Sequence, residues 1–210
     1  MSDSVPYDVL LMRPPTRVFS VPSLLLESDG SKGVRLGHWL TVEQSRSLWQ
    51  LPSSETLKGK RDQAILSILL GCGLRRRELA ELTFDHLQQR EDHWALVDLV
   101  GKAGHIRTVP VPNWVKDNID NWVMAAGIGV GRLFRCVSRA GTVWGERMTE
   151  KVVWHEFAAK LGIPKLAPHD LRRSCARLCH AAGGELEQFV LGHVSVQTTE
   201  KYLSGKQRLR

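Results

Sequence analysis

The sequence predicts a mainly α domain with a small antiparallel β-sheet, an α+β fold, and three observations lead to this prediction. Apolar residues recur at helical spacing in several stretches that begin at capping residues and end at glycines. Two stretches rich in β-formers flank a short turn that contains glycines. The chain has 210 residues, 42% of them hydrophobic and 24% charged, which is enough for one good-sized domain with a core.

The first third of the chain is predicted to hold an arm followed by two helices. Residues 1–35 show no sustained periodicity and contain a proline pair and a polar run with glycines, which indicates an arm. Thr41 and Gln44 make a capping-box pattern, which predicts a helix from there to about Gln50. A second helix is predicted over residues 57–70, and glycines follow it. Its inward residues are Ala64, Ile65, Ile68 and Leu69.

A short helix with a polar start is predicted over residues 74–82. Its apolar residues Leu79 and Leu82 are expected to be buried. Arg75 and Glu78 lie three positions apart, so their side chains can touch on one side of this helix.

A β-hairpin is predicted next, because the hydrophobic period changes. Residues 93–100 and 106–111 are the two strands, and residues 101–105 form the tip, with glycines on both sides of Lys102. A lysine in such a turn is held away from the body of the domain on a long flexible stem.

The stretch after the hairpin predicts two helices with short strands between them. Pro112 introduces an amphipathic helix that glycines at 127–131 end. Residues 133–137 and 142–144 are short strand candidates, and residues 149–162 predict a helix with Thr149 as its cap. The shared face of the first helix contains Val115, Ile119, Trp122, Val123 and Ala126.

The last forty residues bring together histidines, arginines and one tyrosine. A helix is expected to begin at His169, which places Arg172 on the same side of its first turn. Glycines at 183–184 stop this helix, a brief helix over 185–191 follows, and a last helix carries Tyr202. The buried face of the helix from His169 contains Leu171, Cys175, Leu178 and Cys179.

Tyrosine is the unusual member of this polar group. A phenol with a pKa near 10 is a poor nucleophile at neutral pH unless cations stabilise its oxyanion and a base takes its proton. Histidines and arginines can do both, and guanidinium groups match the geometry of a phosphate. The pattern favours a tyrosine that attacks a phosphodiester.

The charge balance agrees with a polyanionic partner. The chain has 29 Lys and Arg against 22 Asp and Glu, a net charge of +7, and basic side chains gain free energy on nucleic acid by releasing counterions. The N-terminus lacks the pattern of a secretory signal, and the longest apolar stretch is too short to cross a bilayer. The four cysteines are scattered, so we expect reduced thiols and no metal site.

Four separate motifs, in this order along residues 40–203, resemble those of the tyrosine recombinase (phage integrase) family. Residues 73–79 resemble its first arginine box and residues 101–110 its lysine hairpin. Residues 169–173 resemble its His-x-x-Arg box, and residues 191–202, from Leu-Gly-His to the tyrosine, resemble its closing box. Each motif alone is weak, but four in the right order are specific.

The resemblance implies the fold of the DNA breaking-rejoining enzymes and a role for each matching residue. Tyr202 would attack the scissile phosphate, form a 3′-phosphotyrosyl link and free a 5′-hydroxyl, with no metal or nucleotide cofactor. Lys102 would be the general acid and His169 the general base. Glu78 would orient Arg75. The implied catalytic set is Arg75, Lys102, His169, Arg172, His193 and Tyr202, in which the two arginines and His193 would bind the phosphate oxygens.

The partners implied by the resemblance are double-stranded DNA and further copies of this chain, as a tetramer at synapsis. Arg76, Arg77 and Arg173 are expected to contact the phosphate backbone. No membrane and no small-molecule substrate are implied. We expect a cytoplasmic protein, on the bacterial nucleoid when bound to DNA, that integrates or excises a mobile element.

Two alternatives remain open at this point. Family members usually carry a helical DNA-clamping domain before the catalytic one, so residues 1–35 are interpreted as an arm or a remnant of that domain and residues 36–210 as the catalytic domain. The chain could therefore be a DNA-binding relic that does not cleave. A type IB topoisomerase-like enzyme would use the same chemistry, although the residues of the motifs resemble those of integrases more closely.

Overall fold

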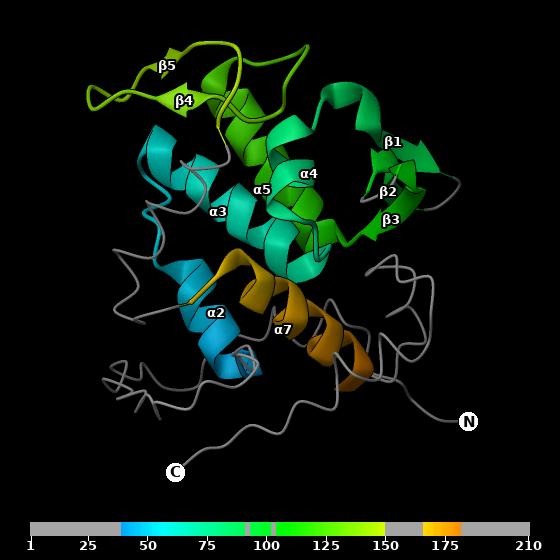
Figure 1. Cartoon of the computed structure of the whole chain (residues 1–210). Coiled ribbons are helices and arrows are strands. Elements are labelled where there is room, and N and C mark those ends of the chain that lie inside the picture. The colour runs from blue at the N-terminus through cyan, green and yellow to red at the C-terminus, as the bar shows by residue number, and fades with distance from the viewer. Residues whose placement is uncertain (1–38, 91–92, 102–103, 150–165, 182–210) are drawn as a thin grey trace, which may run out of the picture.

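The computed structural model describes residues 39–90, 93–101, 104–149 and 166–181 (Figure 1). It has the predicted mainly α fold with a small antiparallel sheet. Helices α3 and α5 lie at the centre, and α2 and α7 lie below them in this view. The three-stranded sheet of β1, β2 and β3 lies at the right of the molecule. The elements are α2 (Val42–Gln50), α3 (Leu57–Gly71), α4 (Arg76–Glu81), η1 (Phe84–His86), β1 (Leu87–Arg90), β2 (His93–Val100), β3 (Ile106–Val111), α5 (Asn113–Ala126), β4 (Cys136–Val137), β5 (Val143–Trp144) and α7 (Pro168–Ala181).

Helix α2 begins with the predicted capping box. Thr41 Oγ1 accepts from the Gln44 N–H at 3.2 Å, and Gln44 Oε1 accepts from the Thr41 N–H at 3.0 Å. Trp49 Nε1 donates to Ser67 Oγ at 2.8 Å, which joins α2 to α3. Helix α3 runs one residue beyond its predicted end, to Gly71.

The core centres on the contact between α3 and α5, and the predicted inward residues of α3 are all buried. Gly71 allows the two helices to approach closely, because a Cβ there would lie 2.5 Å from Val115 Cγ2 and 2.9 Å from the Trp114 ring. Trp122 is fully buried, and its indole N–H donates to the Leu133 carbonyl at 2.9 Å. Gly127 ends α5 in the left-handed conformation, with φ 62°.

The hairpin of β2 and β3 is confirmed, and β1 adds a third antiparallel strand that the sequence analysis missed. Strand β1 has the sequence Leu-Gln-Gln-Arg, in which no apolar alternation signals a strand. Its strand conformation therefore depends on pairing with β2 rather than on a hydrophobic pattern of its own. The Gly101 N–H donates to the His105 carbonyl at 2.7 Å and closes the hairpin near its tip.

The strand predicted over residues 133–137 is mostly wrong. Only its last two residues form a strand, β4, which pairs with β5. Leu133 and Phe134 are buried, but the Leu133 N–H donates to the Leu82 carbonyl at 2.8 Å, so this stretch anchors a loop to the end of α4. Burial in a loop produced the same apolar pattern that a short strand would have.

Helix α7 begins one residue before its predicted start, at Pro168, and its predicted inner face is buried. The Leu40 N–H donates to Ser174 Oγ at 2.7 Å, which joins the start of α2 to the middle of α7. The helices predicted over 149–162, 185–191 and around Tyr202 lie outside the described residues, apart from the cap residue Thr149. None of the helices that the structure describes is both long and apolar enough to span a membrane.

Truncating a side chain in the contact between α3 and α5 should lower stability much more than truncating one on the outer side of α5. We expect Ile119→Ala, at a fully buried position, to lower the free energy of unfolding by about 2–5 kcal/mol. Met124→Ala on the same helix removes a side chain that is 79% exposed and should change it by less than about 0.5 kcal/mol. Urea unfolding measures both, and equal losses would contradict the placement of Ile119 in the core.

Candidate active site

Three of the six predicted catalytic residues lie in the described part of the chain, and α4 and α7 bring them together. Arg75 immediately precedes α4, and His169 and Arg172 lie in the first turns of α7. Lys102, His193 and Tyr202 lie outside the described residues. The described part of the site therefore consists of the two arginines, the histidine and the groups that hold them.

Arg75 is held by Glu78, as its spacing in the sequence predicted. Arg75 Nη1 donates to Glu78 Oε1 at 2.7 Å, and the Arg75 backbone N–H donates to Glu78 Oε2 at 2.7 Å. The second bond caps the N-terminus of α4 with the carboxylate of its own first turn. The Arg75 side chain is 28% exposed, so the guanidinium still reaches solvent while Glu78 orients it.

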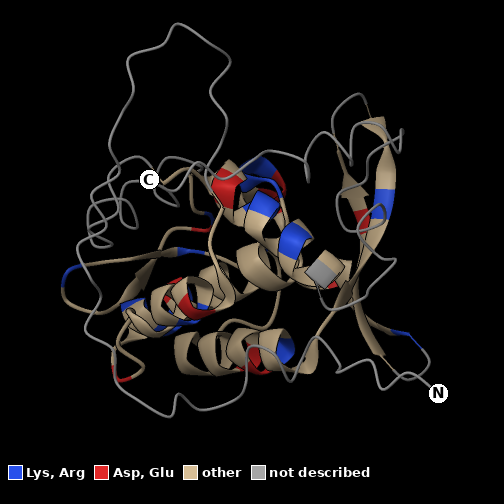
Figure 2. Ribbon diagram, turned by 90° about the horizontal axis from the view of Figure 1, so that it is seen from below, with Lys and Arg blue, Asp and Glu red and all other residues tan. Residues whose placement is uncertain are grey.

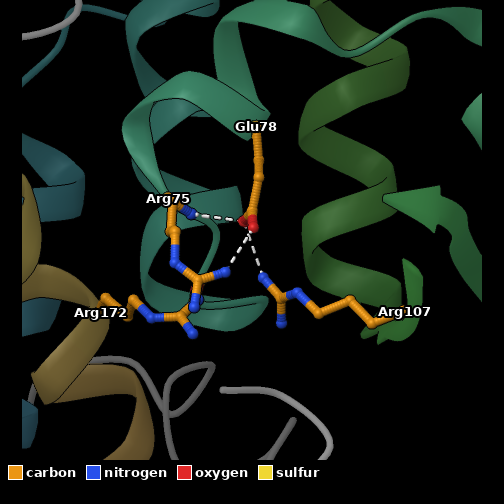
Figure 3. A network of polar contacts seen from close by, with 5 residues as sticks. Arg75, Glu78, Arg107 and Arg172 are labelled. Atoms are coloured by element: carbon orange, nitrogen blue, oxygen red, sulfur yellow. Dashed lines mark hydrogen bonds and ion pairs between the residues drawn. The ribbon is translucent and has the colours of Figure 1, made fainter. Parts of the chain in front are cut away.

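Glu78 also binds an arginine that the sequence analysis did not assign to the site. Arg107, in β3, donates from Nη2 to Glu78 Oε2 at 2.7 Å (Figure 3). Burial by itself would raise the pKa of the Glu78 carboxyl, but the charge of Arg107 and the hydrogen bonds from Arg107 and Arg75 outweigh it and hold the pKa below its usual value. Glu78 is therefore ionised at neutral pH between two cations.

Arg172 reaches the site from the other end of the chain. Arg172 is only 1% exposed, and its Nη1 donates to the carbonyl of Gly73, 99 positions away in the sequence. This bond brings Arg172 to the chain two residues before Arg75, and Figure 3 draws both guanidinium groups at the same end of the network. Two adjacent guanidinium groups form a site that suits a dianionic or singly charged oxyanion such as a phosphate.

The hairpin tip lies against the same pair of side chains. A Cβ on Gly101 would lie 3.2 Å from Arg75 Nη1 and 3.7 Å from Glu78 Oε1, so only a small residue fits there comfortably. Lys102 follows Gly101 in the chain and lies outside the described residues. Gly101, which directly follows β2, thus lies close to the guanidinium of Arg75.

His169 lies exposed at the start of α7, and its surroundings favour the neutral imidazole. Partial desolvation of the ring and the charges of Arg172 and Arg75 lower the pKa of His169 below its usual value, and Asp170 opposes this only in part. A neutral imidazole at pH 7 can accept a proton, which a histidinium cannot. The structure therefore gives His169 the protonation state that a base requires.

The three arginines predicted to contact DNA differ in exposure. Arg76 and Arg77 are exposed on α4, where Arg77 Nε donates to Glu81 at 2.9 Å, and Arg173 is partly buried on α7. Figure 2 shows that Lys and Arg positions are spread over several elements rather than gathered on one helix. Their contact with the phosphate backbone stays a prediction.

The described residues include no group of three or more His, Cys, Asp or Glu side chains placed to hold a metal ion. Cys175 and Cys179 lie within the core on α7. A hydrogen bond with Cys179 and then burial raise the pKa of Cys175, which keeps it a thiol. This pair is a packing element of α7.

Sequence reasoning missed Arg107, although a signal was present. It is a charged residue within a strand of apolar and β-branched residues, directly after the hairpin tip. Such a residue is ordinarily interpreted as solvent-facing, and only the tertiary structure shows that its side chain is 9% exposed and paired with Glu78 of α4.

Comparisons with known proteins cover most of the chain. The model of the phage integrase family matches residues 38–208. The tyrosine recombinase XerC of Pseudomonas putida is 34% identical over 80% of this chain and 56% of its own length, and XerD of Vibrio cholerae is 30% identical over 86% and 61%. The chain thus spans little more than half the length of these curated relatives.

Solved structures show the same fold. The crystal structure of XerA recombinase matches with a TM-score of 0.63 and 24% identity, over 80% of this chain and 61% of that one. A lambda integrase dimer bound to a COC′ core site matches with a TM-score of 0.61 and 17% identity, over 87% and 65%. At these identities the likeness establishes the fold alone.

Removing the Glu78 charge should lower stability in a pH-dependent way. The folded-state pKa of Glu78 is lowered, so its contribution is present above the unfolded pKa and is lost as pH falls through the folded pKa. We expect Glu78→Gln to lower the free energy of unfolding by on the order of 3 kcal/mol at pH 7, because a buried ion pair loses one partner. The difference from wild type should shrink below about pH 4. Urea unfolding across pH measures it, and a constant difference would contradict the ion pairs.

Proposed function

The chain belongs to the phage integrase family, and we propose that it is a site-specific recombinase that cuts and rejoins DNA strands with Tyr202 as nucleophile. The observation that carries this proposal is the convergence of Arg75 and Arg172. Arg172 reaches the Gly73 carbonyl, beside the first arginine box, from the far end of the chain. Two guanidinium groups held in this way can bind the oxygens of one phosphate.

The proposed reaction exchanges one phosphodiester for another. The Tyr202 Oη attacks phosphorus, the bond from phosphorus to the 5′-oxygen breaks, and a 3′-phosphotyrosyl link and a free 5′-hydroxyl result. The reverse attack by a 5′-hydroxyl releases the tyrosine and joins the strands. Because the energy of the broken bond is kept in the new one, the step needs no nucleotide cofactor and no metal.

The arginines supply the electrostatic part of the reaction. Negative charge grows on the non-bridging oxygens in the transition state, and donors already held at that place need no reorganisation. Glu78 keeps Arg75 oriented and the Gly73 carbonyl keeps Arg172 oriented, so both donors are held before substrate binds. We assign to His193 a further hydrogen bond to the same phosphate.

Proton transfer is assigned to His169 and Lys102. The lowered pKa of His169 supports its role as the base that takes the Tyr202 proton. The close approach of Gly101 to Arg75 supports the role of the neighbouring Lys102 as the acid that protonates the leaving 5′-oxygen.

We propose double-stranded DNA as the partner, with Arg76, Arg77 and Arg173 on the phosphate backbone and four copies of the chain at synapsis. The net charge of +7 supports a DNA partner. The reaction would serve the integration or excision of a mobile element, which implies action at the nucleoid.

The nucleophile can be tested with a pool of nicked suicide duplexes whose sequence around the nick is randomised. We expect wild type to form an adduct that survives SDS, and Tyr202→Phe, which lacks only the hydroxyl, to form none. The hydroxyl provides the attacking oxygen, so no residual rate is expected above background. Adduct recovered from the gel identifies the cleaved sequences.

An active wild type whose Tyr202→Phe variant still formed the adduct would refute the assignment of the nucleophile. Salt-sensitive DNA binding with no adduct from any duplex would refute cleavage and favour a DNA-binding relic. Relaxation of a supercoiled plasmid that lacks every recovered sequence would favour a topoisomerase-like activity.

The role of His169 predicts an acid limb in the pH profile of cleavage. Because its pKa lies below the usual value for histidine, the neutral base persists at pH 7 and is lost only at a pH below that usual value, about 6.5. We expect the single-turnover rate to fall about tenfold per pH unit there, as it does when one protonation removes a base. His169→Gln should be slower throughout and lack this limb, and a variant that retained it would contradict the role.

A further inference from the structure

We propose that Arg107 is a positioning residue of this active site, which acts through Glu78 to hold both Arg75 and the β2–β3 hairpin in place for cleavage. The inference rests on the proposed function for its catalytic meaning. The contacts that carry it are present in the described part of the chain and can be tested without DNA. Arg107 lies within the residues that resemble the lysine hairpin, but the predicted catalytic set gives it no role.

The geometry is that of one carboxylate shared between two arginines. Glu78 Oε1 accepts from Arg75 Nη1, and Oε2 accepts from both the Arg75 backbone N–H and Arg107 Nη2, each at 2.7 Å (Figure 3). Arg75 approaches from the chain that enters α4, and Arg107 approaches from β3 on the other side. The carboxylate is thereby fixed from two directions and cannot rotate away from Arg75.

Burial makes this shared carboxylate sensitive to the loss of either partner. The side chain of Glu78 is 4% exposed and that of Arg107 is 9% exposed. A buried carboxylate that loses one cation is left with an incompletely compensated charge, which costs far more than the loss of an exposed ion pair. Removing Arg107 would therefore move Glu78 or draw in water, and Arg75 would follow because its main hydrogen bonds are to Glu78.

Arg107 also fixes the hairpin. It is paired with Leu99 across the ladder, the adjacent Ile106 is paired with Val100, and the Gly101 N–H closes the tip on the His105 carbonyl. The anchor to Glu78 thus lies two ladder steps from Gly101, which itself approaches Arg75. One ion pair sets the distance between the strand end that precedes Lys102 and the arginine of the first box.

A direct contact of Arg107 with the phosphate would be a different role. Its Nη2 is bound to the Glu78 carboxylate, the group that also holds Arg75, whereas Arg75 keeps 28% of its side chain exposed. The arrangement assigns Arg75 to the substrate and Arg107 to the support of Arg75.

The first arm of the test measures single-turnover cleavage of a suicide duplex recovered from the randomised pool. We expect Arg107→Met to slow adduct formation by about 10- to 100-fold, because reacting groups that are misplaced by less than an ångström lose much of their rate. Arg107→Lys retains the charge without the guanidinium fork and should recover part of the rate. The Kd for the same duplex should change by less than about threefold, because a side chain that contacts no phosphate releases no counterion.

Arg139→Met is the matched control. Arg139 is exposed on the turn between β4 and β5, so its loss removes the same charge from the surface without touching Glu78. This variant should cleave at the wild-type rate. A rate for Arg107→Met equal to that of Arg139→Met, with wild type active, would overturn the inference while the proposed function stands.

A double-mutant cycle separates support through Glu78 from a direct role. If Arg107 acts through Glu78, combining Arg107→Met with Glu78→Gln should be no slower than the slower single variant, because both remove the same interaction. Losses that multiply would overturn the inference, since they would mean that Arg107 acts on the substrate independently of Glu78.

The second arm needs neither DNA nor activity. Nuclear magnetic resonance can follow the Glu78 carboxyl carbon during a pH titration and the Nε–Hε signal of Arg75 at neutral pH. Arg107 lowers the pKa of Glu78, so Arg107→Met should raise that pKa and shift or broaden the Arg75 signal, and Arg107→Lys should do less of both.

The two arms distinguish the possible failures. A wild type without adduct refutes the proposed function, and the NMR measurement then decides alone whether Arg107 holds Glu78 and Arg75. Signals of Glu78 and Arg75 that are unchanged in Arg107→Met, in a protein whose remaining spectrum matches wild type, would overturn the inference in either case.

Discussion

The buried carboxylate of Glu78 is the group on which the described part of this site depends. It caps the first turn of α4, orients the guanidinium of Arg75 and binds Arg107 in β3. Burial alone would favour the protonated acid, but two arginines keep it ionised. A single side chain thus couples a helix start, the arginine that we propose binds the phosphate, and a strand, which is why the hairpin and the helix keep a defined separation.

A second constraint brings the C-terminal motif to the same place. Helix α7 is joined to the start of α2 through the bond from the Leu40 N–H to Ser174, and Arg172 reaches through the core to the Gly73 carbonyl. Gly73 follows the helix whose last residue, Gly71, permits the close crossing with α5. The packing of α3 on α5 therefore sets where Arg172 finds its acceptor, and the spacing between Arg172 and Arg75 follows from that core.

Much of the fold could be predicted because its signals are local. The capping box at Thr41, the glycine after α5 and the change of period at the hairpin each act within a few residues, and each was found where expected. Strand β1 could not be predicted, because its residues carry no pattern and only pairing with β2 makes them a strand. The strand predicted over residues 133–137 was too long for the opposite reason, since buried loop residues have the same apolar pattern as a short strand.

The kinds of chemical group, their order and the local pair of Arg75 and Glu78 could be read from the sequence, because they depend on residue identity and short spacing. The tertiary structure was needed to show that Arg107 shares the Glu78 carboxylate and that Arg172 is buried against the Gly73 carbonyl. It also decided that Arg61 and Asp62, which look like ordinary surface charges in the sequence, form an ion pair in the core. The physical reason is that a charge leaves water only when segments pack around it. For Arg107 and Arg172 the same packing, between segments that the chain separates widely, also supplies the partner, whereas Arg61 has its partner next to it in the sequence.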